Sequence, residues 1–250
     1  MTFLSGPKPR IIAHRGLALE APENTLLAFL KALSAGATHL ETDVHASADG
    51  VAVISHDPDL SRTAGREVRV GQLTMTELRR VQLGQGQGFA SLAEALEAFP
   101  EARFNVDVKG DDAVEPTVRA IREARAPDRV LITSFSSARR RRVVQALPGV
   151  ATSPGVSEFT TALAGAKLGL GAVTRRSLAG FTAVQAPRRR GPVSIVTRRT
   201  VRRFQEAGVE VHVWTINDPA EMTQLLDLGV DGIVTDRCDV LHALLAERRA

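Results

Sequence analysis

The sequence predicts an α/β fold of the TIM type, a (β/α)8 barrel with a small insertion after the second strand. Two observations predict it. Short apolar runs alternate with longer amphipathic stretches along the chain, and eight of these runs are candidates for barrel strands. Polar residues also cluster at the C-terminal ends of the runs, where a barrel of this kind assembles its functional site. A length of 250 residues is ordinary for one barrel, so we expect residues 1–250 to form a single domain. A doubly wound open sheet is the alternative fold.

The first strands are predicted within residues 10–55. Residues 10–14 form the first apolar run, and apolar side chains then recur at helical spacing over residues 24–35. Residues 38–44 are the second strand. Residues 51–55 follow too closely for a crossover helix, because parallel neighbours need a dozen or more connecting residues. We therefore predict that they form a hairpin with the second strand instead of a barrel strand.

Residues 57–90 have the pattern of an insertion. They contain a polar loop, a short helix over residues 76–81 and the glycine-rich segment 84–88. That segment follows no strand and opens no helix directly, so it is interpreted as a flexible lid or linker and not as a nucleotide-binding loop. A helix is then predicted from Ser91 to Phe99, because Ser91 and Glu94 have the spacing of a capping box.

Six further strands complete the predicted barrel. They are residues 103–109, 129–134, 149–153, 182–186, 209–215 and 232–235. The helical stretches between them include residues 113–124, 138–146, 157–168, 197–207 and 219–228. Residues 149–153 have the weakest strand pattern of the set.

The composition bears on where the protein acts. No stretch approaches the roughly 18 apolar residues that a membrane span needs, and residues 1–10 lack the apolar region of a signal peptide. Cys238 is the single cysteine, so no intramolecular disulfide can form, which is typical of a reducing compartment. These features favour a cytoplasmic protein.

Charge is unevenly distributed along the chain. Residues 1–125 hold 14 Lys and Arg against 17 Asp and Glu, whereas residues 126–250 hold 18 against 11. The arginines of the second half form either a solvated helix surface or a basic surface that attracts anionic substrates or lipid headgroups. No nucleic-acid motif accompanies them, so we expect no nucleic-acid partner. Peripheral membrane contact stays open, and the sequence does not indicate an oligomeric state.

Three carboxylates are predicted to meet at one end of the barrel. Glu41 and Asp43 are two residues apart in a strand, so their side chains point to the same face. Asp107 and Lys109 repeat that arrangement on the next barrel strand. Three converging carboxylates repel one another unless a cation lies between them, and oxygen ligands favour a hard ion, Mg²⁺ or Ca²⁺. The alternative is that these acids pair with arginines at the barrel rim.

Two histidines lie beside these acids. His14 and His56 each end a strand, and histidine titrates near neutrality, so the pair could supply one acid and one base. Phosphodiester cleavage needs both, whereas a zinc site is the competing use of two histidines and a carboxylate. Trp214 belongs either to the core or to a pocket wall. The residues without comparable partners are His39, His45, His212, His242 and Cys238.

An ordered set of motifs contains these residues. The motifs are His14-Arg-Gly, Pro22-Glu-Asn-Thr25, Glu41-Thr-Asp43, Asp49-Gly50, His56-Asp57, Asn105-Val-Asp-Val-Lys109, Val213-Trp-Thr-Ile-Asn217 and Gly229-Val-Asp-Gly-Ile-Val-Thr-Asp236. The set resembles the signature of the glycerophosphodiester phosphodiesterases, from about residue 10 to residue 241. Residues 57–90 match the small insertion of that family's TIM-like barrel.

The resemblance implies divalent-metal-dependent hydrolysis of glycerophosphodiesters to sn-glycerol 3-phosphate and an alcohol. It assigns the residues as follows: His14 and His56 as the acid/base pair, Glu41, Asp43 and Asp107 as metal ligands, and Arg15 and Lys109 as phosphate contacts. Trp214, as a residue of the pocket wall, is predicted to contact the substrate. The family often has glutamate where this sequence has Asp107, which is one methylene shorter. The choice of metal is therefore more open than the activity.

Two other functions remain compatible with the same residues. One is a lysophospholipid-cleaving enzyme of the phospholipase D type, which a long apolar groove or membrane-surface binding would favour. The other is a catalytically weak phosphate-binding barrel, which would require damage to the acid/base pair. Residues 150–200 carry little family signal, so the preferred alcohol is not indicated.

Overall fold

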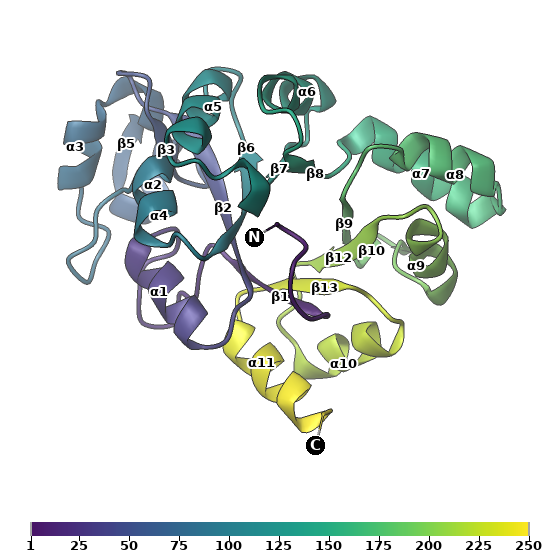
Figure 1. The fold of residues 1–250 in the computed structure, drawn as a ribbon. Helices are drawn as coiled ribbons and strands as arrows, with labels where there is room; N and C mark the ends of the chain where they lie inside the picture. Colours follow the sequence, from purple (N-terminus) through teal and green to yellow (C-terminus); the bar gives the residue numbers. More distant parts are fainter. Residues whose placement is uncertain (1, 250) are drawn as a thin grey trace.

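The computed structural model describes residues 2–249 and shows a ring of parallel strands surrounded by helices (Figure 1). The barrel strands are β1 (Arg10–His14), β2 (His39–Ala46), β6 (Arg103–Val108), β7 (Val130–Thr133), β8 (Ala151–Thr152), β9 (Ala183–Pro187), β12 (Glu210–Trp214) and β13 (Gly232–Thr235). They pair in the order β8-β7-β6-β2-β1-β13-β12-β9. The first strand therefore lies between the second and the last, as a barrel requires. This confirms the predicted TIM-type fold and excludes the doubly wound sheet.

The barrel is nearly closed between β8 and β9. Within residues 2–249 these two strands share no ladder, but the Thr182 amide donates to the Thr152 carbonyl oxygen at 2.8 Å. The Thr152 amide in turn donates to the Thr182 hydroxyl at 3.2 Å. β8 is only two residues long, in agreement with the weak pattern of residues 149–153. The seam is therefore the least regular part of the wall.

The outer helices agree broadly with the predicted pattern. They are α1 (Leu26–Ser34), α4 (Leu92–Ala98), α5 (Val114–Glu123), α6 (Ser137–Ala146), α7 (Val156–Leu168), α8 (Gly171–Leu178), α9 (Arg198–Gln205), α10 (Pro219–Asp227) and α11 (Cys238–Glu247), with a 3-10 turn η2 (Pro127–Arg129). Helix α8, helix α11 and the hairpin β10 (Arg189–Arg190) and β11 (Val193–Ser194) were not among the predicted elements. Only Thr174 and Leu178 of α8 are buried, which is too few apolar contacts to produce a helical pattern in the sequence.

Capping residues determine where helices begin and end. The Thr25 hydroxyl accepts a hydrogen bond from the Ala28 amide at the start of α1. Ser91 and Glu94 form the predicted capping box at the start of α4. Gly36 follows α1 with a φ of 92°, a left-handed conformation that glycine adopts without steric cost.

Residues 52–89 form a small subdomain beside the barrel. β3 (Ala52–Ile54) pairs antiparallel with β2, which confirms the predicted hairpin. The next elements are β4 (Asp59–Leu60), α2 (Ser61–Ala64), β5 (Arg66–Arg69), the 3-10 turn η1 (Val70–Gln72) and α3 (Met75–Arg80). Strands β4 and β5 pair with each other where a polar loop was predicted. The difference arises because Leu60, Val70 and Leu78 are fully buried and belong to an apolar cluster separate from the barrel core.

The glycine-rich segment is a hydrogen-bonded turn. The Gln87 amide donates to the Gly84 carbonyl oxygen, and the Leu83 amide donates to the Gln87 carbonyl oxygen, both at 2.9 Å. The Gln87 side-chain oxygen also accepts from the Leu27 amide at 3.4 Å. The turn is therefore joined to α1, and its action as a lid stays a prediction.

The N-terminal segment covers the amino end of the barrel, and Figure 1 shows it in the middle of the ring of strands. Phe3 is 1% exposed and packs with Leu131 and Ala183. His39 donates from Nε2 to the Phe3 carbonyl oxygen over 2.8 Å, and burial lowers its pKa to about 3, so the ring is neutral. His39 is the first residue of β2 and therefore lies at the amino end of the barrel.

A buried ion pair holds the N-terminal segment in place. Arg10, 2% exposed, lies 3.0 Å from Glu210, and its guanidinium also donates to carbonyl oxygens of residues 4–7. Glu210 also accepts a hydrogen bond from His212 and forms an ion pair with Lys8, each over 3.0 Å. Burial alone would raise the pKa of Glu210, but these partners outweigh it and lower the pKa to about 2.

Membrane spans are not a feature of this fold: between residues 2 and 249, no helix combines the length and the apolar character needed to cross a bilayer.

We expect Glu210→Gln to destabilise the protein by about 3–5 kcal/mol, because the Arg10 charge would remain buried without its partner. The pKa of Glu210 is lower in the folded state than its ordinary 4.5, so its contribution is complete above pH 4.5 and is lost as the pH falls towards about 2. The stability difference between wild type and variant should therefore shrink over that range. Denaturant unfolding at several pH values measures both effects.

The matched control is Glu206→Gln, which removes the ion pairs of an exposed glutamate with Arg202 and Arg203. Exposed pairs contribute only about 0–1 kcal/mol. Equal effects of the two substitutions would contradict a structural role for the buried pair.

Candidate active site

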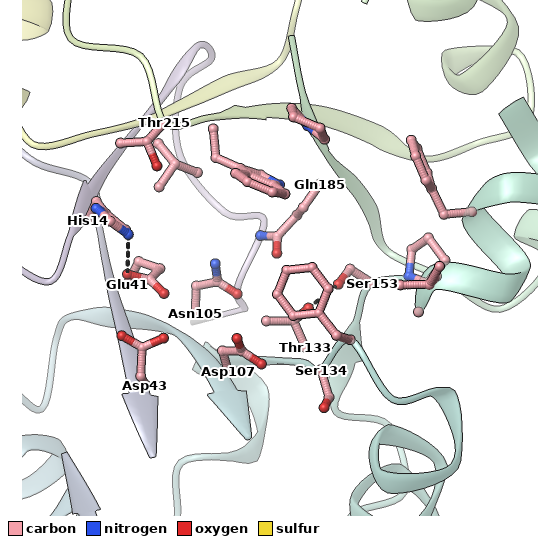
Figure 2. Close-up of a pocket in the computed structure, with 18 of the residues that line it drawn as sticks. His14, Glu41, Asp43, Asn105, Asp107, Thr133, Ser134, Ser153, Gln185 and Thr215 are labelled. Carbon is pink, nitrogen blue, oxygen red and sulfur yellow. Dashed lines mark hydrogen bonds and ion pairs between the residues drawn. The ribbon is translucent and has the colours of Figure 1, made fainter. Parts of the chain in front are cut away.

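A cavity of about 660 Å³ opens at the carboxyl end of the barrel strands (Figure 2). All eight residues predicted for the site contribute to its lining: His14, Arg15, Glu41, Asp43, His56, Asp107, Lys109 and Trp214. They come from β1, β2, β6 and β12 and from the loops that follow β1, β3 and β6. Residues up to 200 positions apart in the sequence therefore meet in one place, as the barrel prediction implied.

The strand register explains why the acids converge. Glu41 pairs with His14 on one side and with Asn105 on the other, and Asp43 pairs with Asp107. Residues paired across a parallel ladder lie on the same face, so these five side chains all point into the barrel mouth. Figure 2 shows the carboxylates of Glu41, Asp43 and Asp107 gathered around the Asn105 amide.

His14 is held by a carboxylate on its outer side. Its Nδ1 lies 2.7 Å from Asp236 Oδ1, and the Asn217 amide donates to the other Asp236 oxygen at 2.6 Å. Because Nδ1 donates to Asp236, the other ring nitrogen, Nε2, faces the cavity. Nε2 lies 3.9 Å from the Glu41 carboxylate. Burial alone would lower the pKa of His14, but the hydrogen bond to Asp236 and the charge of Glu41 outweigh it and raise the pKa.

Buried negative charge dominates the opposite wall. Burial, followed by the charge of Asp43, raises the pKa of Glu41 to about 8, and burial also raises the pKa of Asp107. Lys109 Nζ lies 2.8 Å from Asp43 and 2.6 Å from Asp107. Although burial opposes it, the two carboxylates raise the pKa of Lys109 to about 12. Arg15 Nε also lies 3.4 Å from Asp43, so Lys109 and Arg15 are the cations beside this buried carboxylate cluster.

Two buried oxygen atoms in this cluster lack a hydrogen-bond partner among the described residues. They are Asp107 Oδ1 and Asn105 Oδ1. Unpaired buried acceptors are costly unless a ligand or ion satisfies them. In residues 2–249, however, no three His, Cys, Asp or Glu side chains are close enough to hold a metal ion. Lys109 bridges Asp43 and Asp107 instead, so a cation would have to displace its ammonium group.

An ion-pair network joins Arg15 to His56 through the subdomain. Arg15 lies 3.1 Å from Glu23, which also pairs with Arg62 of α2 at 2.5 Å. Arg62 then contacts Asp57 at 2.6 Å, and Asp57 lies 2.8 Å from His56 Nδ1. Residues 57–90 thus help to position both a predicted phosphate contact and a predicted catalytic histidine.

The backbone after β1 takes an unusual path that the motif residues permit. Arg15 has a φ of 56°, and its amide donates to the Glu41 carboxylate at 3.1 Å. At Gly16, with a φ of 84°, an added Cβ would lie 2.7 Å from the Ala28 carbonyl carbon of α1. Only glycine allows this approach, which gives a physical reason for the His-Arg-Gly sequence. Asn24, also left-handed at 56°, donates to Asp43 at 3.3 Å.

The remaining wall of the cavity is largely apolar. Trp214 is partly exposed and meets Phe135 edge to face, with ring centroids 6.3 Å apart. Val156, Phe159 and Leu163 of α7 extend this surface. Of the two alternatives for Trp214, the structure therefore shows the pocket wall.

Sequence reasoning missed several residues of the site. Asp236 and Asn217 were not proposed to act on His14, although Asp236 directly follows the last strand, which closes the barrel beside β1. Phe135 gave no signal because it belongs to a loop. Cys238 is fully buried, and burial raises the pKa of its thiol to about 11, in agreement with the absence of a matching base.

A family model and individual relatives match this chain over most of its length. The model of the glycerophosphoryl diester phosphodiesterase family matches residues 14–240. The probable glycerophosphodiester phosphodiesterase 2 of Mycobacterium tuberculosis is 42% identical over 239 residues, which cover 95% of this chain and 90% of that protein. The human lysophospholipase D GDPD1 is 27% identical over 90% of this chain and 82% of its own length.

Solved structures share the fold. A glycerophosphodiester phosphodiesterase from Agrobacterium tumefaciens is 25% identical with a TM-score of 0.75, over 94% of this chain and 99% of that one. An Oleispira antarctica phosphodiesterase in complex with the product sn-glycerol-3-phosphate has a TM-score of 0.77 and 24% identity, over 96% and 97% of the two chains.

We expect Asp236→Asn to lower the pKa of His14, because the variant loses the carboxylate that stabilises the protonated ring. NMR titration of the His14 imidazole in protein treated with a chelator measures this shift. Asp57→Asn, which alters the partner of His56, is the matched control and should leave the His14 titration close to that of the wild type. A His14 pKa unchanged in Asp236→Asn would contradict the assigned contact.

Proposed function

Because the chain belongs to the glycerophosphoryl diester phosphodiesterase family, we propose that it hydrolyses glycerophosphodiesters to sn-glycerol 3-phosphate and an alcohol. The observation that supports this most directly is the single cavity lined by both histidines, the three carboxylates, Arg15 and Lys109. The proposal treats the chain as one barrel domain in which residues 57–90 are an insertion. A cytoplasmic location stays a prediction.

Arg15 and Lys109 are the proposed contacts of the phosphodiester. Both side chains are cationic and line the cavity beside the acids. Asp43 and Asp107 hold the ammonium group of Lys109 in this structure; with a cation bound to these two carboxylates, Lys109 would be free to contact a phosphate oxygen. The two cations would then stabilise negative charge as it develops on the phosphorus oxygens. Trp214 is the proposed wall against which the carbon atoms of the substrate pack.

Glu41, Asp43 and Asp107 are the proposed ligands of one divalent ion, Mg²⁺ or Ca²⁺. Their all-oxygen donor set, the unpaired Asp107 Oδ1 and the raised pKa of Glu41 support a cation at this position. A bound ion would supply Lewis-acid stabilisation of the phosphodiester oxygens. These residues favour a hard ion over zinc, because carboxylates outnumber the nitrogen ligands that zinc prefers.

His14 and His56 are the proposed acid/base pair. The raised pKa of His14 favours a protonated ring, and Asp236 orients that ring so that Nε2 faces the cavity. His14 is therefore the better candidate for the acid that protonates the departing alkoxide, which leaves His56 as the base. The base removes a proton from the nucleophile as the bond between phosphorus and the leaving oxygen breaks.

Two nucleophiles are compatible with this arrangement. The neighbouring glycerol hydroxyl would attack phosphorus and form a cyclic phosphate, which water then opens to glycerol 3-phosphate. An intramolecular hydroxyl benefits from proximity. Direct attack by water is the alternative route.

Cleavage of lysophospholipids is a second candidate activity at the same site. The apolar wall formed by Phe135, Val156, Phe159 and Leu163 favours it, and the human relative carries the name lysophospholipase D. A phosphate-binding barrel without catalysis is disfavoured, because both histidines line the cavity together with all three carboxylates.

We expect release of glycerol 3-phosphate from glycerophosphocholine and glycerophosphoethanolamine, abolished by EDTA and restored by Mg²⁺ or Ca²⁺. A coupled dehydrogenase detects the product. His14→Ala and His56→Ala should each lose about 10²–10⁴-fold in kcat, the usual contribution of a general acid or base. His242→Gln, on the exposed surface of α11, is the control and should retain activity.

Undiminished turnover after chelation, or in either alanine variant, would contradict the assignment. Choline release from lysophosphatidylcholine without any glycerol 3-phosphate from the soluble diesters would favour the second activity.

The cyclic route predicts that a substrate lacking the hydroxyl next to the phosphodiester is not cleaved. A deoxy analogue of glycerophosphocholine tests this, with choline release as the measurement. The analogue should instead act as a competitive inhibitor, because its phosphate contacts are intact. Its turnover at a rate close to that of the parent compound would favour direct attack by water.

A further inference from the structure

One side of the barrel carries a high positive charge. It is formed by α7, α8, α9 and the β10–β11 hairpin. Residues 159–205 contain ten lysines and arginines and not one aspartate or glutamate. Helix α7 packs against both α8 and α9. Figure 1 shows these helices and β10 together on one side of the ring of strands, away from the subdomain that contains α3 and β5.

Six arginines on this side are exposed and form no ion pair with a described residue. Arg175 and Arg176 lie on α8, Arg189 and Arg190 on β10, and Arg198 and Arg199 on α9. No acidic group of residues 2–249 lies within ion-pair distance of any of them. In the subdomain, Arg62 and Arg79 pair with glutamate, whereas the exposed Arg66 and Arg80 form no ion pair with a described residue. We call the side of the barrel that carries the six arginines the basic face.

Exposed aliphatic side chains accompany these arginines. Leu168, Leu170 and Val173 at the turn between α7 and α8 are 71%, 50% and 39% exposed. The guanidinium groups of Arg199 and Arg175 lie close to the backbone of this turn. A Cβ atom built on Gly169 would be 2.9 Å from Arg199 Nη2, and a Cβ atom built on Gly171 would be 3.4 Å from Arg175 Nη1. Cationic and aliphatic groups are therefore adjacent, a combination suited to the boundary between lipid headgroups and acyl chains.

The basic face is continuous with the mouth of the cavity. Phe159 and Leu163 of α7 line the cavity, and the same helix ends at the exposed Leu168. Arg190 of β10 also contributes to the cavity lining. At the rim, Phe135 and Val156 are 64% and 49% exposed. A surface lying against this face would therefore be next to the entrance of the site.

We propose that the basic face docks on an anionic lipid bilayer, with Leu168, Leu170 and Val173 entering the headgroup region and the arginines contacting lipid phosphates. Charge complementarity identifies the anionic partner, and the exposed aliphatic residues distinguish a bilayer from a nucleic acid. Proteins that bind single-stranded nucleic acids without sequence preference stack the bases on aromatic side chains, whereas the residues at this turn are aliphatic. The proposal does not depend on the proposed function.

Sedimentation with vesicles tests it directly. The full chain should bind vesicles of equal parts phosphatidylcholine and phosphatidylglycerol, bind phosphatidylcholine vesicles far more weakly, and be released by salt. The double variant Arg175→Gln, Arg199→Gln should bind the anionic vesicles about 25-fold more weakly, because each arginine near such a surface contributes about fivefold. Leu168→Ser with Leu170→Ser should weaken binding about tenfold through loss of apolar contact.

The matched control is Arg66→Gln with Arg80→Gln. These two arginines are also exposed, and they lie in the subdomain, so the variant has the same net charge as the first one. It should bind anionic vesicles as the wild type does. All variants should keep wild-type secondary structure by circular dichroism, and the rate on soluble glycerophosphocholine should be unchanged, which separates docking from damage to the site.

Three results would overturn the proposal. One is that the protein binds neutral and anionic vesicles equally, or binds neither kind. Another is equal loss of binding in the control and in the basic-face variant, which would indicate net charge and not this face. The third is tighter binding to a single-stranded homopolymer RNA than to the vesicles, with the leucine substitutions having no effect.

Discussion

The arrangement of the site depends on the pairing of β1 with β2 on one side and with β13 on the other. This closure places His14 between Glu41, its ladder partner, and Asp236, which follows the last strand. In a doubly wound open sheet the last strand would lie at an edge, not paired with the first strand, and His14 would have no partner from it. The same pairing continues to β6 and brings Asp107 next to Asp43.

The two ends of the barrel differ in whether their buried polar groups have partners. At the amino end, Arg10 and Glu210 satisfy each other with help from Lys8 and His212, and the pKa of Glu210 is lowered. At the carboxyl end, burial raises the pKa of Glu41, and acceptor atoms remain without partners. Satisfied charge stabilises the fold, whereas unsatisfied charge is available to a ligand.

The cavity has two walls with different chemical properties. β2 and β6 supply acids and lysine, whereas the loop after β7 and helix α7 supply Phe135, Phe159 and Leu163. The subdomain supports the polar wall through Arg62, and the basic face continues the apolar wall outwards. A substrate with a phosphodiester at one end and a less polar group at the other would match this division.

The sequence alone determined the barrel, the hairpin after the second strand and eight residues that line the cavity. Alternating apolar and amphipathic stretches are local patterns, and side chains two residues apart on a strand must share a face. Only the tertiary structure decided that Asp236 orients His14, that Lys109 bridges Asp43 and Asp107, and that an apolar cluster folds residues 57–90. Each of these depends on contacts between distant parts of the chain, which are set by strand register and barrel closure and leave no periodic pattern in the sequence.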